Sequence, residues 1–293
     1  METSLISTRD GVVEYARREG NSIPIVLLSG IGGSLFEWRD FFETDLNILS
    51  YNRAGYGQSE WANKERTVEE ASGELISLLH SLGLQQKIIL AGHSYGGLIA
   101  QDFVIRHPEL VFGVLLIDAT PMDVERIEEI ENSDETSTNA YWIKKCATYA
   151  KMTKEELSAE LQPELPELFR KWEDDIQTAL LDHDTSPDLY RAVGSEIRYM
   201  VSSANQLDKS NFPNLPLTVI GRDGEHASKQ QIKAGTPANE VVTFEKVWEE
   251  LIFEQAQLAT GSRYIKATGS GHNIPYDCPE LVIKEVSRLS QEL

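Results

Sequence analysis

A serine flanked by glycines is the part of the sequence with the clearest chemical meaning. Residues 92–96 read Gly-His-Ser-Tyr-Gly, follow an apolar run at 88–91 and precede a helical pattern at 97–106. Strand, tight turn and helix in this order lift a serine hydroxyl clear of a sheet, and glycines let the strand and helix approach closely. The first N–H groups of the helix then face any developing negative charge. The pattern predicts that Ser94 is a nucleophile rather than a solvated loop serine.

A nucleophilic serine needs a base that takes its proton, and histidine has a pKa suited to that work. Of the six histidines, His272 lies alone in a glycine-rich loop after the last expected strand. His93 is inside the serine turn, and His183 and His226 could line a pocket. Because nucleophile, acid and base follow one another along the chain in this arrangement, we predict that His272 is the base.

Two aspartates are candidates for the acid that orients the base. Asp118 follows the apolar run 111–117, and Asp223 follows the run 217–220. Both lie between the serine and the histidine, and a carboxylate in either place could fix the imidazole tautomer. Each could equally be a turn residue or the N-cap of a helix. The residues alone therefore leave both candidates open.

A glycine-rich loop follows another apolar run near the N-terminus. Residues 29–34 read Ser-Gly-Ile-Gly-Gly-Ser after the run 23–28. A dinucleotide-binding fingerprint would need a third glycine at the position of Leu35, so that interpretation fails. Backbone N–H groups in such a loop can come close to a substrate and form an oxyanion hole. We predict that the N–H groups of Ile31 and Tyr95 are its two donors.

These residues must be positioned by a sheet, because each follows an apolar run and strands alternate with helices. The alternation predicts an α/β protein with a doubly wound, mostly parallel sheet, whose strands bring their carboxyl ends to one edge. A stretch of roughly ninety residues without a convincing strand interrupts the alternation and is too long for a loop. We interpret 122–212 as a helical lid, inserted after the strand that ends at Asp118, and 1–121 with 213–293 as the core.

Composition excludes several classes of function. The 293 residues include 27 Lys and Arg against 47 Asp and Glu, and the resulting net charge of −20 disfavours nucleic acids and anionic membranes as partners. Cys146 and Cys278 lie too far apart for a metal-ligand pattern and form no disulfide framework. No signal peptide or membrane-spanning run is visible. We expect a cytoplasmic protein with a small-molecule substrate, without cofactor or metal; the oligomeric state stays open.

Four segments carry the motifs of one family: 29–32, 52–59 (Asn-Arg-Ala-Gly-Tyr-Gly-Gln-Ser), 92–97 and 269–272 (Gly-Ser-Gly-His). Together they resemble the α/β-hydrolase superfamily, in the type with a serine nucleophile and a helical lid. The resemblance spans nearly the whole chain and is specific for the superfamily but not for a substrate. Two positions depart from the usual motifs: Ser29 stands where histidine is usual, and Asn52 where aspartate is usual. The loop that begins at Asn52 is interpreted as structural.

The resemblance implies a serine hydrolase, with a carboxylic ester as the favoured substrate. The usual acid of the family lies three residues beyond a glycine after the lid, which here is Gly224, so Asp223 is one residue short. A subgroup carries the acid after the strand that precedes the lid, and on this resemblance we favour Asp118. Ser94 argues against the family's dehalogenases and epoxide hydrolases, whose nucleophile is aspartate. Carbon–carbon hydrolases, lyases, perhydrolases and low-turnover receptors of the same fold remain alternatives.

Overall fold

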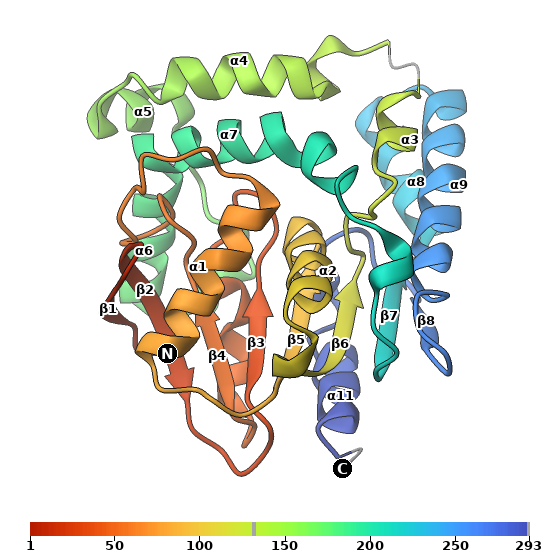
Figure 1. Ribbon diagram of the computed structural model, residues 1–293. Coiled ribbons are helices and arrows are strands. Elements are labelled where there is room, and N and C mark those ends of the chain that lie inside the picture. Colours follow the sequence, from red (N-terminus) through yellow and green to blue (C-terminus); the bar gives the residue numbers. More distant parts are fainter. Residues whose placement is uncertain (131–132, 292–293) are drawn as a thin grey trace.

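The computed structural model describes residues 1–130 and 133–291 (Figure 1). Eight strands form one sheet in the order β1-β2-β4-β3-β5-β6-β7-β8, in which β3 to β8 are parallel and β1 and β2 are antiparallel. The predicted α/β class with a mostly parallel sheet is confirmed. The strands are β1 (Ser4–Thr8), β2 (Gly11–Arg18), β3 (Ile25–Leu28), β4 (Ile48–Tyr51), β5 (Ile88–His93), β6 (Val111–Ile117), β7 (Leu217–Arg222) and β8 (Arg263–Ala267).

Helices cover both faces of the sheet, which explains why its central strands are apolar without alternation. In β3, Val26 and Leu28 pack into a core beneath α1, α2 and α9, whereas Ile25 and Leu27 pack into a second core with η1, α10 and α11. Both faces of this strand are therefore buried away from water. The covering helices are η1 (Leu35–Glu43), α1 (Val68–Ser81), α2 (Tyr95–Arg106), α9 (Ala238–Gln255), α10 (Ile274–Asp277) and α11 (Pro279–Leu289), and α8 (Gly224–Ala234) packs against α9.

Between β6 and β7 the chain forms a helical insertion, by which we mean residues 122–212. Its described residues, 122–130 and 133–212, contain helices and no strand. Figure 1 shows α4 and α7 crossing beyond the carboxyl ends of the parallel strands. The helices are α3 (Glu125–Glu128), α4 (Asn139–Tyr149), α5 (Lys154–Leu161), α6 (Asp174–Asp184) and α7 (Pro187–Ala204), with 3₁₀ turns at Glu135–Ser137, Phe169–Lys171 and Lys209–Asn211; a further turn, Pro108–Leu110, precedes β6.

Two apolar clusters attach the helical insertion to the rest of the molecule. One joins Leu189 and Ala192 of α7 to Tyr56 in the loop after β4. The other joins Trp172 and helix α6 to the start of η1, where Leu35 is fully buried. The insertion is thus packed against the two loops that follow β3 and β4.

Helix α8 gives Asp223 a structural role. It begins directly after β7, where the side chain of Asp223 accepts the backbone N–H of His226. It ends at Ala234 and is followed by Gly235, whose φ of 109° is the left-handed conformation that commonly terminates helices. Asp223 therefore acts as a helix N-cap. In the described part of the chain, no helix combines the length and apolar character that crossing a membrane requires.

Candidate active site

Ser94 occupies a single-residue junction between β5 and α2. Its φ of 53° and ψ of −124° are strained for a residue other than glycine. The surrounding glycines make the junction possible, because a Cβ on Gly96 would overlap the carbonyl oxygen of Leu28, and one on Gly92 would lie 2.5 Å from the carbonyl oxygen of Gly96. The carbonyl of Ser94 is held by the N–H of Thr120 at 2.9 Å. The strained turn predicted from the sequence is therefore present.

His272 bridges the serine and a buried carboxylate. Its Nε2 lies 3.1 Å from Ser94 Oγ, and its Nδ1 lies 2.6 Å from Asp118 Oδ2. The Asp118 side chain is fully buried, whereas 37% of the His272 side chain is exposed. A carboxylate can only accept, so Nδ1 carries the proton and Nε2 is left to accept the hydrogen of the serine hydroxyl. The arrangement can move a proton from Ser94 to the imidazole.

Besides His272, three further donor groups hold Asp118 as an anion. Trp248 donates its indole N–H to Oδ1 at 2.8 Å, and Arg222 donates its backbone N–H to Oδ1 and its guanidinium to Oδ2, both at 3.3 Å. Burial alone would raise the pKa of Asp118, but the Arg222 charge and the bonds from His272 and Trp248 hold this pKa below its ordinary value. Asp118 therefore stays ionised and can stabilise an imidazolium.

The structure does not bring Asp223 to His272. Its carboxylate accepts the N–H of Gly269 at 3.1 Å and lies 3.2 Å from Lys266 Nζ, besides capping α8. Strand β7 continues through Arg222, so Asp223 is the first residue beyond the sheet and turns into the next helix. The two aspartates therefore have different partners, and only Asp118 is bonded to the imidazole of His272.

Two backbone donors lie on the elements beside the serine. A Cβ on Gly30 would lie 3.1 Å from Ser94 Cβ, so the loop after β3 passes directly against the serine. Tyr95 is the first residue of α2, where N–H groups have no partner within the helix. Within residues 1–130 and 133–291, neither the Ile31 N–H nor the Tyr95 N–H has a hydrogen-bond partner. Both remain free to bind an oxyanion.

His93 supports the loop that carries the base. Its Nε2–H donates to the carbonyl oxygen of His272 at 2.9 Å, and the two rings lie 4.9 Å apart. Burial, reinforced by the neighbouring His272, lowers the pKa of His93 to about 3, so this ring is neutral. It holds His272 by its backbone and leaves the imidazole free for Ser94.

Three contributors to this site were not anticipated from the sequence: Trp248, Arg222 and the supporting contact of His93. Trp248 lies in the middle of α9 within no motif. Arg222 ends β7 and could have been noticed as a charge at the carboxyl edge of the sheet. Neither signal specifies a contact with Asp118. Across the described residues, no group of three or more His, Cys, Asp and Glu side chains is arranged to hold a metal ion.

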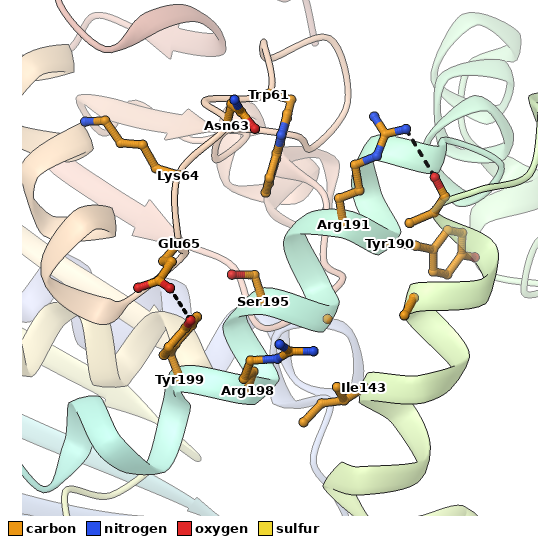
Figure 2. A pocket seen from close by; sticks show the side chains of 13 residues that line it. Trp61, Asn63, Lys64, Glu65, Ile143, Tyr190, Arg191, Ser195, Arg198 and Tyr199 are labelled. Atoms are coloured by element: carbon orange, nitrogen blue, oxygen red, sulfur yellow. Dashed lines mark hydrogen bonds between the residues drawn. The ribbon is translucent and has the colours of Figure 1, made fainter.

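A hollow of about 420 Å³ lies apart from these residues, between the loop after β4 and helices α4 and α7 (Figure 2). Trp61, Tyr190 and Arg198 line it, and none of Ser94, Asp118 and His272 does. Figure 2 shows the Tyr199 hydroxyl bonded to Glu65 at its edge. This hollow is therefore distinct from the serine site.

The sequence of this chain is similar to those of known proteins. The sequence profile described as "Alpha/beta hydrolase family" matches residues 25–285. An AB hydrolase superfamily protein of Gibberella zeae is 28% identical over 263 residues, which cover 83% of this chain and 78% of that protein.

Solved structures share the fold at low sequence identity. An enol-lactonase from Burkholderia xenovorans has a TM-score of 0.67 at 18% identity, covering 99% of this chain and 100% of the other. A thermophilic esterase from Thermogutta terrifontis has a TM-score of 0.64, also at 18% identity and with the same coverage. An epoxide hydrolase from Acinetobacter nosocomialis has a TM-score of 0.71 at 14% identity, covering 98% of this chain and 88% of the other. With most of its length matched by the family profile, this chain belongs to the alpha/beta hydrolase family.

Proposed function

We propose that this protein is a serine hydrolase that cleaves carboxylic esters. The observation that supports the proposal best is the unbroken chain of hydrogen bonds from Asp118 through His272 to Ser94 Oγ. The two free N–H groups of Ile31 and Tyr95 add a place for the negative charge that acyl transfer develops. A hydroxyl nucleophile, a base and an oxyanion hole are the parts that ester cleavage requires.

In the first half of the reaction, Ser94 Oγ attacks the ester carbonyl while His272 Nε2 takes its proton. The carbonyl oxygen becomes an oxyanion that accepts the N–H groups of Ile31 and Tyr95. Asp118 stabilises the imidazolium without taking its proton. When the tetrahedral intermediate collapses, the bond to the leaving alcohol breaks, and His272 returns the proton to that oxygen.

In the second half, water replaces the alcohol. His272 takes a proton from the water, whose oxygen attacks the acyl carbon, and the same N–H groups hold the second oxyanion. When the bond between the acyl carbon and Ser94 Oγ breaks, His272 returns the proton to that oxygen, which releases the acid and restores the serine hydroxyl. The partial exposure of His272 is consistent with access for this water.

The activities of two of the structural relatives agree with an ester substrate. One is an enol-lactonase and another an esterase, and a lactone is a cyclic ester. The epoxide hydrolase shares the fold, but Ser94 stands at the position where we expect such enzymes to carry aspartate. The ester class is therefore the first to test.

We further propose that residues 122–212 act as a lid on a core formed by 1–121 and 213–293. The insertion lies beyond the carboxyl ends of the parallel strands, where the loops carrying Ser94, Asp118 and His272 also lie (Figure 1). Ligands of open α/β sheets bind at that edge. Helices α4 to α7 would then shape the space that selects the acyl and alcohol groups.

A substrate panel tests the proposed reaction. Purified protein would be assayed against short p-nitrophenyl esters, lactones, anilides and a β-diketone, and treated in parallel with a fluorophosphonate that labels activated serines. We expect ester or lactone turnover and a label on Ser94. A strong preference for the diketone would instead assign a carbon–carbon hydrolase, and labelling of Ser94 without any turnover would favour a receptor.

A further inference from the structure

We propose that the helical insertion supplies two positioning residues: Glu196, which fixes the direction of the oxyanion-hole N–H of Ile31, and His183, which holds the loop at the peptide that follows Gly32. The inference rests on the proposed function, because it concerns the oxyanion hole of that reaction. Glu196 lies on α7 and His183 on α6, whereas the loop they fix, residues 29–32, follows β3. We call 29–32 the oxyanion loop.

Glu196 acts on the oxyanion loop through Arg53. The Glu196 carboxylate is fully buried and accepts two bonds from the Arg53 guanidinium, at 2.8 and 3.0 Å. The same guanidinium donates to the carbonyl oxygens of Ser29 and Gly30, at 2.7 and 2.9 Å. The guanidinium group is planar and its N–H groups point in fixed directions. A carboxylate that is bonded to two of these N–H groups therefore sets the direction of the others. The carboxylate on α7 therefore determines where the two carbonyls point.

The bond to Gly30 fixes the Ile31 donor directly. The carbonyl of Gly30 and the N–H of Ile31 belong to one peptide unit, which is planar and trans, so they point in opposite directions. With its oxygen held 2.9 Å from Arg53, this peptide cannot rotate without losing the bond. No cis peptide occurs in the described residues. The Ile31 N–H is consequently directed away from Arg53.

The next two peptide units are also held, because the N–H of Gly32 belongs to the Ile31–Gly32 peptide and its carbonyl belongs to the Gly32–Gly33 peptide. Gly32 donates its N–H to the Tyr56 hydroxyl at 3.1 Å, and that hydroxyl donates to Glu196 at 2.5 Å. The carbonyl of Gly32 accepts His183 Nε2–H at 2.9 Å, while His183 Nδ1 accepts the N–H of Gly57 at 3.1 Å. Burial lowers the pKa of His183, in keeping with a neutral ring that both donates and accepts. Ile31 thus lies between two anchored peptides.

The chain contains a matched buried ion pair that does not contact this loop. Arg66 and Glu74 are bonded to each other and nearly as buried as Arg53 and Glu196. Glu74 also accepts the N–H of Ala54, and no bond links it to residues 29–32. Glu74→Gln therefore reproduces the loss of a buried carboxylate charge beside an arginine without releasing the oxyanion loop.

The experiment compares Glu196→Gln and Glu74→Gln with the wild type by ester kinetics at one pH. An oxyanion-hole donor acts in the transition state and not on the bound ester, so we expect kcat of Glu196→Gln to fall by about tenfold to a hundredfold with KM within about twofold. Glu74→Gln should keep kcat within about threefold. Equal losses of kcat in the two variants would overturn the proposal, because a general effect on packing would then explain both.

Tyr56→Phe provides a second test if Glu196→Gln does not fold. It keeps the ring and removes the hydroxyl that links Gly32 to Glu196. We expect a smaller fall in kcat, about threefold to tenfold, again with KM unchanged. Unchanged kcat in this folded variant would count against the proposal.

Hydrogen exchange gives a readout that does not depend on turnover. The peptide covering residues 28–36 should exchange faster in Glu196→Gln and Tyr56→Phe than in Glu74→Gln and the wild type. A loop that loosens in a protein without esterase activity would uphold the anchoring and reject the proposed reaction. A loop that exchanges at the wild-type rate in all variants, in an active enzyme, would reject the anchoring alone.

Discussion

Asp118 and His272 are 154 residues apart in sequence, yet the carboxylate oxygen lies 2.6 Å from the imidazole Nδ1. Asp118 follows β6 and His272 follows β8, and β7 lies between these strands in the sheet. The parallel direction of all three brings their carboxyl ends to one edge. The bond therefore depends on strand order as much as on the two residues.

This relationship predicts different outcomes for the two aspartates. Asp118→Asn should lower kcat by a factor on the order of 10³–10⁴, because a neutral amide neither enforces the imidazole tautomer nor stabilises the imidazolium. Ester kinetics of the purified variants measures the effect.

Asp223→Asn is the matched control. Asparagine also caps helices well, so both the fold and kcat should be retained within about threefold. A large loss in Asp223→Asn with little loss in Asp118→Asn would reverse the assignment of the acid.

Trp248→Phe removes the indole donor from Asp118 while a ring remains to stack on Phe244, whose centroid lies 5.8 Å away. Because a bond to a buried charge is lost, we expect kcat to fall about tenfold. Steady-state kinetics would show it. The control is Trp142→Phe, a change at an exposed tryptophan, which should leave kcat unchanged. A wild-type kcat in Trp248→Phe would mean that the indole bond to Asp118 is dispensable.

The buried neutral His93 predicts a contribution to acid sensitivity. Its pKa is about 3 in the folded protein and about 6.5 in the unfolded chain. Above pH 6.5 both states are neutral and His93 contributes no slope. Between these pH values the unfolded chain binds the proton and the folded protein does not, so the free energy of unfolding decreases as pH falls, by about 1.4 kcal/mol per pH unit at most.

The measurement is urea unfolding of the wild type and His93→Gln between pH 7 and pH 4. Glutamine keeps a donor for the His272 carbonyl and does not titrate. We expect the free energy of unfolding to fall less steeply with acid in the variant. Parallel curves for the two proteins would show that His93 does not resist protonation in the folded state.

The tight approach of the strand and helix at the serine turn predicts a large cost for a single methyl group. In Gly96→Ala the new Cβ would overlap the carbonyl oxygen of Leu28. Thermal or urea unfolding should show destabilisation of about 1–3 kcal/mol, together with lower activity.

Gly73→Ala is the control, because it lies inside α1 with no atom near the added methyl group. It should stabilise the protein by about 0.5–1 kcal/mol, since alanine favours helix over glycine. Equal stability of Gly96→Ala and the wild type would show that the turn has room for a side chain.

The sequence is most informative where a function depends on adjacent residues. The spacing around Ser94 was enough to predict the strained turn, because Gly92 and Gly96 create it locally. The choice between Asp118 and Asp223 could not be made from the residues, because it depends on where β7 ends and which strand lies beside it. Resemblance to a subgroup of the family was needed to favour Asp118.

Contacts made by side chains on long helices were not predictable. Trp248 and Glu196 lie within amphipathic patterns that explain them as ordinary helix residues, and only the folded chain shows their partners. Arg53 lies in a segment whose loop character was predicted and was interpreted as structural. Its bonds to two loop carbonyls depend on a carboxylate far away in the sequence, on α7.

The most direct test of the proposed reaction is the kcat of Ser94→Ala on a short p-nitrophenyl ester that the wild type hydrolyses. The variant keeps the fold and the binding surface but lacks the oxygen that lies 3.1 Å from His272 Nε2. We predict a fall in kcat by a factor on the order of 10⁶ and loss of fluorophosphonate labelling. Hydrolysis at the wild-type rate by the folded variant would contradict the assignment of Ser94 as the nucleophile.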